Sequence, residues 1–240
     1  MVRVAVAQEN TTTVEISAGA NLSAVSQLDG VLIVPRWSPA VALVYRSDIF
    51  LIDSENGIGV ALFRDRPVHI GALLDYQYGR RVAAESRYRG LGNIDGALAP
   101  AVFIEWEPIR DALDFYAKAS KATAGSMGWL YKLEFSGGLP LAQNKSIYVD
   151  ITANASDGAY AQSYYGVSAE QSAASGYAPY SPRGGWLTLN SAVGYEYRYS
   201  QKLALDAQIG QLRYLDSAAQ SPLTSGGPYL TAGVFASYRY

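Results

Sequence analysis

The sequence predicts an all-β protein: a closed, antiparallel, up-and-down transmembrane β-barrel of about twelve strands. Three observations support this prediction. Apolar side chains recur at every second position over most of the chain, which is the period of a β-strand. The connections between these segments alternate between long and short. Aromatic side chains gather at the ends of the apolar faces, as they do where a membrane meets water.

The chain is rich in tyrosine and poor in charge. It has 240 residues with 19 Tyr against 6 Phe and 4 Trp, and only 17 % of its residues are charged, below the usual quarter or so. Tyrosine is amphipathic and suits a membrane interface, although a tyrosine-rich soluble β-sandwich has a similar composition. The formal net charge of −2 gives no reason to expect a nucleic-acid partner.

Two residue counts exclude whole classes of site. There is no Cys, so disulfides and thiolate metal sites are excluded, and the single His, His69, excludes any site that needs two imidazoles. No stretch approaches the roughly 18 consecutive apolar residues of a membrane helix. Because only helices and closed barrels can span a bilayer, a soluble protein and a membrane barrel are the alternatives that stay open.

Alternation places the strands along the chain. In 187–199, Leu187, Val193 and three tyrosines share one face, and small or charged side chains occupy the other. We expect twelve strands, at 13–23, 37–46, 48–54, 57–64, 67–79, 94–107, 110–121, 126–138, 145–156, 186–199, 201–215 and 227–240. The third and fourth are the weakest, because Gly57 and Gly59 are also compatible with a bulge in one long strand.

The connections favour a membrane barrel over a soluble sandwich. The predicted short joints are 46–48, 65–67, 107–109, 140–144 and 200–201, and the long ones are 24–36, 80–93, 121–125, 157–185 and 216–226. Apart from the short joint 54–56, long and short alternate, as periplasmic turns and external loops do. A Greek-key sandwich has no reason to produce this order. An even number of strands places both termini on the periplasmic side.

The two ends of the chain carry further signals. Residues 1–7 end in Ala-Val-Ala, a pattern of the kind cleaved by signal peptidase, and we expect them to be the remnant of an export signal; an ordinary N-terminal extension is the alternative. Residues 8–240 are then a single barrel domain, because no repeat, charge run or linker divides them. The final octet, GVFASYRY, alternates and ends in an aromatic, as expected for a strand that pairs with the first to close the barrel.

The polar faces of the strands supply the candidate lumen residues. In a membrane barrel these faces point inward, where acids are expected to pair with Lys or Arg. The candidate lumen-facing residues are His69, Asp75, Glu105, Asp114, Lys118, Lys132, Glu134, Asp150, Glu196 and Arg198. Two carboxylate pairs are available on these faces, Asp114 with Glu134 and Glu105 with Asp95. We expect Lys118, Lys132 and Arg198 to neutralise such acids rather than leave them for catalysis.

The sequence brings no catalytic or cofactor-binding constellation together. His69 is the only base for a serine hydrolase, and we expect it to fill the lumen near the periplasmic end of its strand. The glycines of 90–92 and 226–227 lack the strand-to-helix setting of a phosphate-binding loop. We therefore predict no enzymatic activity, no cofactor and no metal site.

A basic cluster falls on a predicted external loop. It consists of Arg80, Arg81, Arg87 and Arg89. Guanidinium groups bind phosphate in a bidentate manner, so the cluster is a candidate contact for lipopolysaccharide. The alternative is a solvated loop in which Glu85 is the acidic partner of these arginines.

Three segments carry a family resemblance. RYRGLGNIDGALAPAVFIEWEP (87–108) resembles a strand entry of the MipA/OmpV family, and QSYYGVSAEQSAASGYAPY (162–180) resembles one of its loops. LALDAQIGQLRYLDSAAQSPL (203–223) is similar to the family's penultimate strand and the loop that follows. The resemblance covers about residues 13–240, whereas 26–37 departs from the family's pattern.

The resemblance implies an outer-membrane barrel of a Gram-negative bacterium. The name-giving member of the family is a scaffold that brings a murein-degrading lytic transglycosylase together with a murein-synthesising penicillin-binding protein; other members are described as porin-like, adhesive or stress-linked. We therefore expect a scaffold whose periplasmic turns dock murein-remodelling enzymes and whose surroundings are outer-membrane lipid and lipopolysaccharide. A narrow porin-like channel is the alternative, with side chains and the long loop 157–185 as candidates to plug its lumen.

Overall fold

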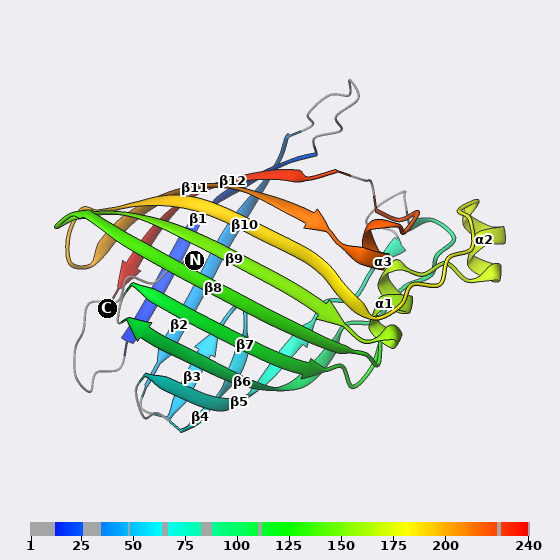
Figure 1. Ribbon diagram of the computed structural model, residues 1–240, viewed down its shortest axis with the longest axis horizontal. Coiled ribbons are helices and arrows are strands. Elements are labelled where there is room, and N and C mark those ends of the chain that lie inside the picture. The colour runs from blue at the N-terminus through cyan, green and yellow to red at the C-terminus, as the bar shows by residue number, and fades with distance from the viewer. Residues whose placement is uncertain are drawn as a thin grey trace.

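Twelve strands follow one another around a closed β-barrel in the part of the chain that the structure describes (Figure 1). The structure is a computed structural model, and it describes residues 13–25, 35–47, 49–63, 67–82, 88–109, 112–224 and 227–239. Each strand is antiparallel to its neighbours in the chain, and β12 pairs with β1 to close the barrel. The predicted fold class is confirmed. Residues 1–7, the expected export remnant, lie outside the described residues.

The strands lie close to their predicted positions. They are β1 (Thr13–Val25), β2 (Pro35–Arg46), β3 (Phe50–Asp53), β4 (Gly57–Phe63), β5 (Val68–Gln77), β6 (Ala97–Ile109), β7 (Leu113–Lys121), β8 (Trp129–Ala142), β9 (Lys145–Ser156), β10 (Gly185–Arg198), β11 (Leu203–Tyr214) and β12 (Tyr229–Arg239). Three helices accompany them: α1 (Gly158–Tyr165), α2 (Ala169–Ser175) and α3 (Asp216–Ala219). No helix in the described ranges is long and apolar enough to cross a membrane.

The two ends of the barrel differ in their connections. The connections after β5, β7, β9 and β11 are long and lie at the end that carries the helices, which we call the loop end (right in Figure 1). Those after β2, β4, β6, β8 and β10 are short and lie at the opposite end, which we call the turn end. This order confirms the predicted alternation of long and short connections.

The apolar faces of the strands point outward. Along β6, Ala99 and Phe103 are buried inside the barrel, whereas Val102, Ile104 and Trp106 are exposed on its outer surface. Exposed apolar side chains in such numbers are costly in water but are what the hydrocarbon of a bilayer requires. The wall therefore presents its apolar side to lipid and its polar side to the lumen, as the alternation predicted.

One residue departs from this alternation. Leu187 was expected on the oily outward face, but it is buried, where it packs with Ala161 and Ala218. The cause is a register shift between β9 and β10 at Trp186 and Thr188. Because a bulge adds one residue to a strand, it moves the side chains beyond it to the other face.

Two predicted joints are also wrong. Residues 107–109 were expected to form a turn, but β6 continues to Ile109. Pro140 was placed in a joint, but β8 continues to Ala142 through a register shift. In both places the strand includes a proline, which lacks the amide proton of a regular ladder and is tolerated where the ladder is interrupted.

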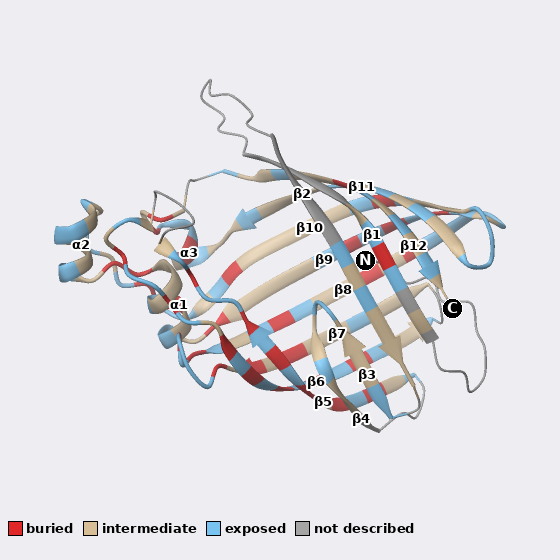
Figure 2. Cartoon of the chain, turned by 180° about the vertical axis from the view of Figure 1, so that it is seen from behind, coloured by how far each residue is buried: buried red, intermediate tan, exposed pale blue. Residues whose placement is uncertain are grey.

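The third and fourth strands form a short hairpin of their own. β3 pairs with β4 from Phe50–Val60 to Asp53–Gly57, so the alternative of one long bulged strand is wrong. The three-residue turn between them, 54–56, lies part-way up the barrel wall rather than at the loop end (Figure 2). Gly57 there has a φ of 110°, a conformation that favours glycine.

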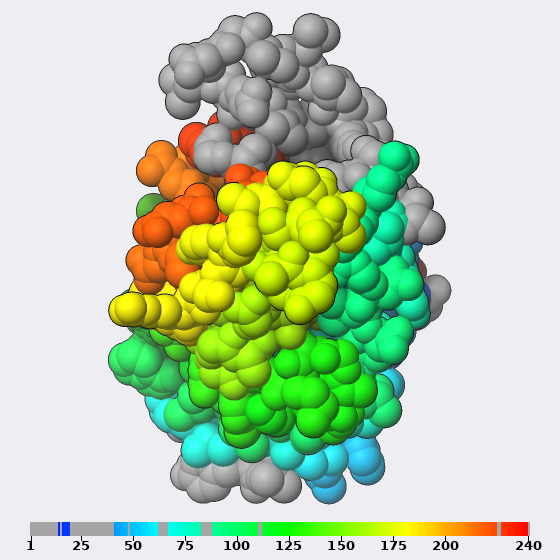
Figure 3. All heavy atoms as spheres, turned by 90° about the vertical axis from the view of Figure 1, so that its right-hand side faces the viewer, coloured from blue at the N-terminus to red at the C-terminus, as the bar shows by residue number. Residues whose placement is uncertain are grey.

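The loop end carries what we call the loop cap, the described residues of 78–96, 157–184 and 215–224. In the view onto this end, atoms of the connection after β9 (yellow) lie between those of the connections after β5 (teal), β7 (green) and β11 (orange) (Figure 3). Hydrogen bonds join these connections: the Gln171 side chain donates to the carbonyl of Leu91 at 2.6 Å, and Ser221 donates to that of Tyr165 at 2.6 Å.

Candidate functional site

The lumen is divided into two unlike halves. Side chains that point inward from β5 to β8, which we call the packed half, are mostly buried; Leu73, Phe103 and Ser120 are examples. Side chains that point inward from β10 to β12, which we call the solvated half, are mostly half-exposed, as at Asn190 and Gln208. The difference is visible as red bands on β5 and β6 and tan bands on β10 and β11 (Figure 2).

An ionic layer crosses the middle of the packed half. It consists of Glu55, Asn56, Asp75, Lys118, Lys132 and Glu134. The ammonium of Lys118 lies 2.8 Å from Asp75, and that of Lys132 lies 2.8 Å from Glu134 and 3.0 Å from Glu55. Both lysines also donate to the Asn56 side chain, at 3.4 and 3.2 Å. Since Asn56 is in the β3–β4 turn and the lysines are on β7 and β8, the turn leans inward across the lumen.

An apolar cluster fills the lumen beside the ionic layer. Leu73, Ala101 and Phe103 form its buried centre, and Leu51 of β3 and Tyr116 of β7 pack against it. The rings of Phe103 and Tyr116 are stacked with their centroids 5.8 Å apart. The ionic layer and this cluster together fill the middle of the packed half, so any path for water must run along the solvated half.

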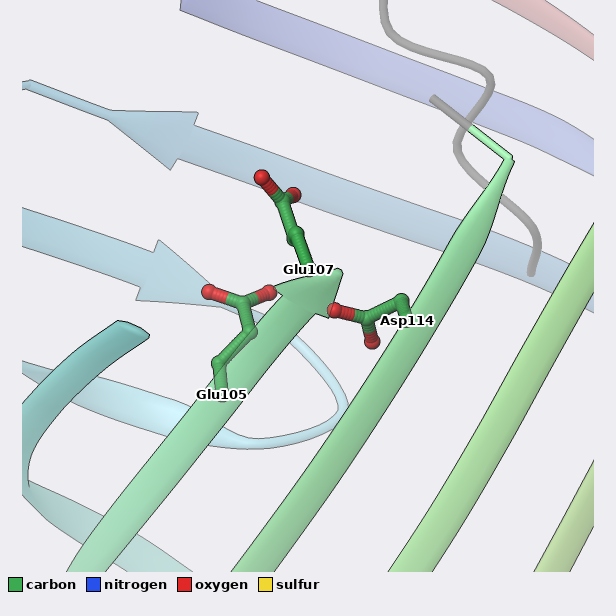
Figure 4. Close-up of side chains that lie close together, drawn as sticks. All are labelled: Glu105, Glu107 and Asp114. Carbon is green, nitrogen blue, oxygen red and sulfur yellow. The ribbon is translucent and has the colours of Figure 1, made fainter. Parts of the chain in front are cut away.

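Three carboxylates converge near the turn end (Figure 4). Glu105 and Glu107 come from β6 and Asp114 from β7, and one oxygen of each lies within 4.8 Å of the others. Such oxygens are the donors that Ca²⁺ and Mg²⁺ prefer. Glu105, however, already faces two basic groups of the protein: Arg46 at 3.1 Å and the His69 ring at 3.2 Å. The carboxylate of Glu105 therefore already has basic partners in the protein itself.

The acids are grouped differently from the expected pairs. Asp114 lies beside Glu105 and Glu107, whereas Glu134 binds Lys132. Asp95 lies at the loop end, where it pairs with Arg81 at 3.2 Å. Glu107 was missed because it was placed in a turn; its odd number, shared with the inward Glu105, is the signal that could have found it.

The remaining candidate lumen residues lie on β9 and β10. Asp150 accepts a hydrogen bond from Ser136 at 2.7 Å. Glu196 forms an ion pair with Arg198 two residues further along β10, at 2.8 Å. Each of these charged groups therefore has a close partner along the wall.

The basic cluster is split by the loop cap. Arg80 is buried and donates to the carbonyls of Leu91 and Tyr164, at 3.3 and 3.4 Å. Burial lowers the pKa of its guanidinium. Arg80 therefore holds loops together instead of facing solvent. Arg81 and Arg89 are exposed, and Arg87 lies outside the described residues.

The three segments that carry the family resemblance meet in the loop cap. Leu91 belongs to the first segment, Val167 to the second and Leu223 to the third, and these three side chains form one buried cluster. Tyr88, Tyr177 and Tyr180 pack against it. Three segments that are far apart in the sequence thus share one small core. This shared core is a physical reason for all three motifs to be present in the same chain.

A family model described as MltA-interacting protein MipA matches residues 17–240. The chain belongs to the MipA family. The resemblance predicted from the three segments is confirmed, and it extends over nearly the whole barrel. The motifs of the MipA-family chain supply the buried cluster of its loop cap, whereas at the turn end they contribute only the last residues of the first segment and the first residues of the third.

Solved structures of outer-membrane channels are similar to this MipA-family barrel. The NanC porin matches 95 % of this chain and 99 % of its own, with 9 % identity and a TM-score of 0.47. OmpF of Salmonella typhi, solved with daunomycin, matches 96 % and 98 %, with 10 % identity and a TM-score of 0.45. DcaP of Acinetobacter baumannii matches 96 % of both chains, with 10 % identity and a TM-score of 0.42. Comparison with curated protein sequences finds no match.

Proposed function

We propose that this chain is an outer-membrane scaffold that holds a murein lytic transglycosylase together with a penicillin-binding protein, and that it catalyses no reaction itself. The observation that supports the proposal is the family match over residues 17–240, because the family is described by its interaction with MltA. For this role the barrel is oriented with its turn end toward the periplasm, which contains the murein. The loop end, with Arg81 and Arg89 exposed, faces lipopolysaccharide.

The β8–β9 hairpin is the docking surface that we propose for the transglycosylase. β8 pairs with β7 only as far as Gly137, so Leu139 and Leu141 lie beyond the end of the neighbouring strand. They are 66 % and 59 % exposed on a hairpin that projects at the turn end (Figure 1). Exposed leucines on a projecting hairpin are costly in water and are typical of a surface that binds another protein.

Co-purification from native membranes tests this proposal. We expect the tagged protein to retain a lytic transglycosylase, and the double variant Leu139→Ser/Leu141→Ser to lose at least about nine-tenths of it, because a few apolar anchors carry most of an interface. The matched control is Tyr78→Ser/Met127→Ser, which removes exposed apolar side chains at the loop end. Equal retention by both double variants, or none by the unmodified chain, would contradict the proposal.

A narrow porin-like channel is the second candidate function. The observation that favours it is the solvated half of the lumen, where inward side chains such as Asn190, Gln208 and Ser237 are small or polar and half-exposed. A channel requires a polar path of this kind. The loop cap covers the loop end of that path, so single-channel conductance is the measurement that decides between a path that is open and one that is closed.

A further inference from the structure

The barrel wall has a notch between β2 and β5. β2 pairs with β1 from Arg46 to Pro35, but with β3 only over Val44–Arg46. Toward β3, its last hydrogen bonds join Leu43 to Ser54, at 3.0 and 3.2 Å. Beyond Leu43, no strand among the described residues pairs with this edge of β2. The short β3–β4 hairpin therefore leaves the upper part of β2 with a free edge.

The opposite side of the notch is the end of β5. β5 pairs with β6 as far as Gln77, but with β4 only as far as Leu74, which faces Ile58. Residues 75–77 therefore have a partner strand on one side only within the described ranges. At about 3.3 Å per residue, this side of the notch is roughly 10 Å long.

The notch begins at the level of the hydrocarbon. Tyr76 and Tyr78 are exposed on the outer face of β5, with their rings edge to face at 5.2 Å. Aromatic side chains of this kind gather at the membrane interface. Leu74 lies below them along the strand, so the hairpin stops on the lipid side of the interface. A free strand edge is not tolerated against hydrocarbon, since its backbone polar groups find no partner there.

The two faces of the notch differ in polarity. Its outer rim is apolar: Val41 is 73 % exposed, and Leu43, Ile58 and Leu74 are also exposed. Its inner side is the ionic layer, with the Asn56 amide and the Asp75–Lys118 pair at its base. A molecule that lies across the notch therefore meets lipid-like surface outside and polar groups inside.

We propose that this notch is a lateral opening through which an amphiphile with one acyl-type chain moves between the outer leaflet and the lumen. The chain stays in the hydrocarbon against the apolar rim, while the head group hydrogen-bonds the free backbone groups and the polar groups inside. The ionic layer blocks the packed half below the notch, so the head group remains in the part of the lumen nearer the loop end. This opening is independent of the scaffold role and of its docking hairpin.

Photolabelling from the membrane tests the opening. The protein is reconstituted in phosphatidylcholine vesicles that contain a long-chain fatty acid with a diazirine beside its carboxyl group, and labelled residues are identified by mass spectrometry. We expect Asn56 and Asp75 to be labelled about tenfold more than Asn190, because lumen residues behind a closed wall are out of reach of hydrocarbon. Asn190 controls for probe that enters through water. Labelling of Asn56 and Asp75 at the level of Asn190 would overturn the proposal.

A lengthened hairpin gives the second measurement. Insertion of two residues before Ser54 and two after Asn56 extends β3 and β4 along the edges of β2 and β5, and it should reduce the labelling of Asp75 to the level of Asn190. The matched control is a four-residue insertion between Gln143 and Asn144, in the β8–β9 turn, which should leave labelling unchanged. Undiminished labelling in a folded, lengthened hairpin would also overturn the proposal. Where that variant does not fold, the comparison of Asp75 with Asn190 in the unmodified protein decides.

Discussion

The packed and solvated halves of the lumen are built from the same kind of strand but have opposite interiors. In the packed half, inward side chains such as Phe103, Tyr116 and Lys132 meet one another and the inward-leaning β3–β4 turn. In the solvated half, inward residues such as Asn190 and Gly210 are small enough to leave room for water. The barrel's strand number therefore does not decide whether its lumen is open, because side-chain volume and one short hairpin do.

Each half of the barrel has a glycine that lies beneath an aromatic ring of the neighbouring strand. Gly71 of β5 lies opposite Phe103 of β6, and Gly194 of β10 lies opposite Tyr148 of β9; in each pair the aromatic ring covers the glycine. The Phe103 ring is held by the apolar cluster. The Tyr148 hydroxyl instead reaches the side chain of Gln208, at 3.4 Å. The same local arrangement is thus held by apolar packing on one side of the barrel and by a hydrogen bond on the other.

Removal of Lys132 is the largest disturbance that we expect in the packed half. Lys132→Met leaves Glu55 and Glu134 without the ammonium that lies within 3.0 Å of both. Loss of one partner from a buried ionic group costs about 3 kcal/mol or more. We therefore expect the free energy of unfolding to fall by about that amount. Urea unfolding in detergent micelles, followed by tryptophan fluorescence, measures the change.

Lys202 supplies the control for this variant. It is an exposed lysine in the turn between β10 and β11, so Lys202→Met should change the unfolding free energy by no more than about 0.5 kcal/mol. Equal effects of the two substitutions would show that the ionic layer contributes no more than a surface charge does, and the distinction between the two halves would then rest on the apolar cluster alone.

The two glycines give a smaller and more direct test. A Cβ at Gly71 would overlap both the Phe103 ring and the backbone carbonyl of Val60, whereas the nearest atoms to one at Gly194 all belong to the end of the Tyr148 side chain. We expect Gly71→Ala to cost about 2 kcal/mol and Gly194→Ala about 1 kcal/mol or less, since the end of a side chain can shift where a backbone carbonyl cannot. The same urea series measures both. A cost for Gly194→Ala equal to that for Gly71→Ala would contradict this difference between the two halves.

The strands and the outward faces could be predicted from the sequence because the side-chain period of a strand is independent of its partners. The exceptions are local. Leu187 changes face at a bulge, and Glu107 was lost when a strand was ended at a proline. Neither feature alters the composition of the segment, so alternation alone does not reveal it.

The arrangement of the lumen could not be predicted in the same way. Lys132 meets the inward acid Glu134, as expected, but its second partner, Glu55, comes from a turn that was assigned no inward role. Arg46 likewise reaches Glu105 from β2. Which side chains meet across the lumen depends on the tilt of the strands, and that tilt is set only when the barrel closes. The three family segments were recognised separately, whereas their meeting at Leu91 became visible only in the folded chain.

Conductance gives the finest test of the comparison. Asn190 and Ser191 are neighbours on β10 that face the lumen and the lipid, respectively. If ions cross along the solvated half, Asn190→Trp should lower single-channel conductance in planar bilayers by about half, since it narrows the polar path, and Ser191→Trp should leave it unchanged. Equal conductance in both variants would place the path elsewhere. No conductance in the unmodified protein would show that the loop cap closes the solvated half, and a scaffold would then need no channel.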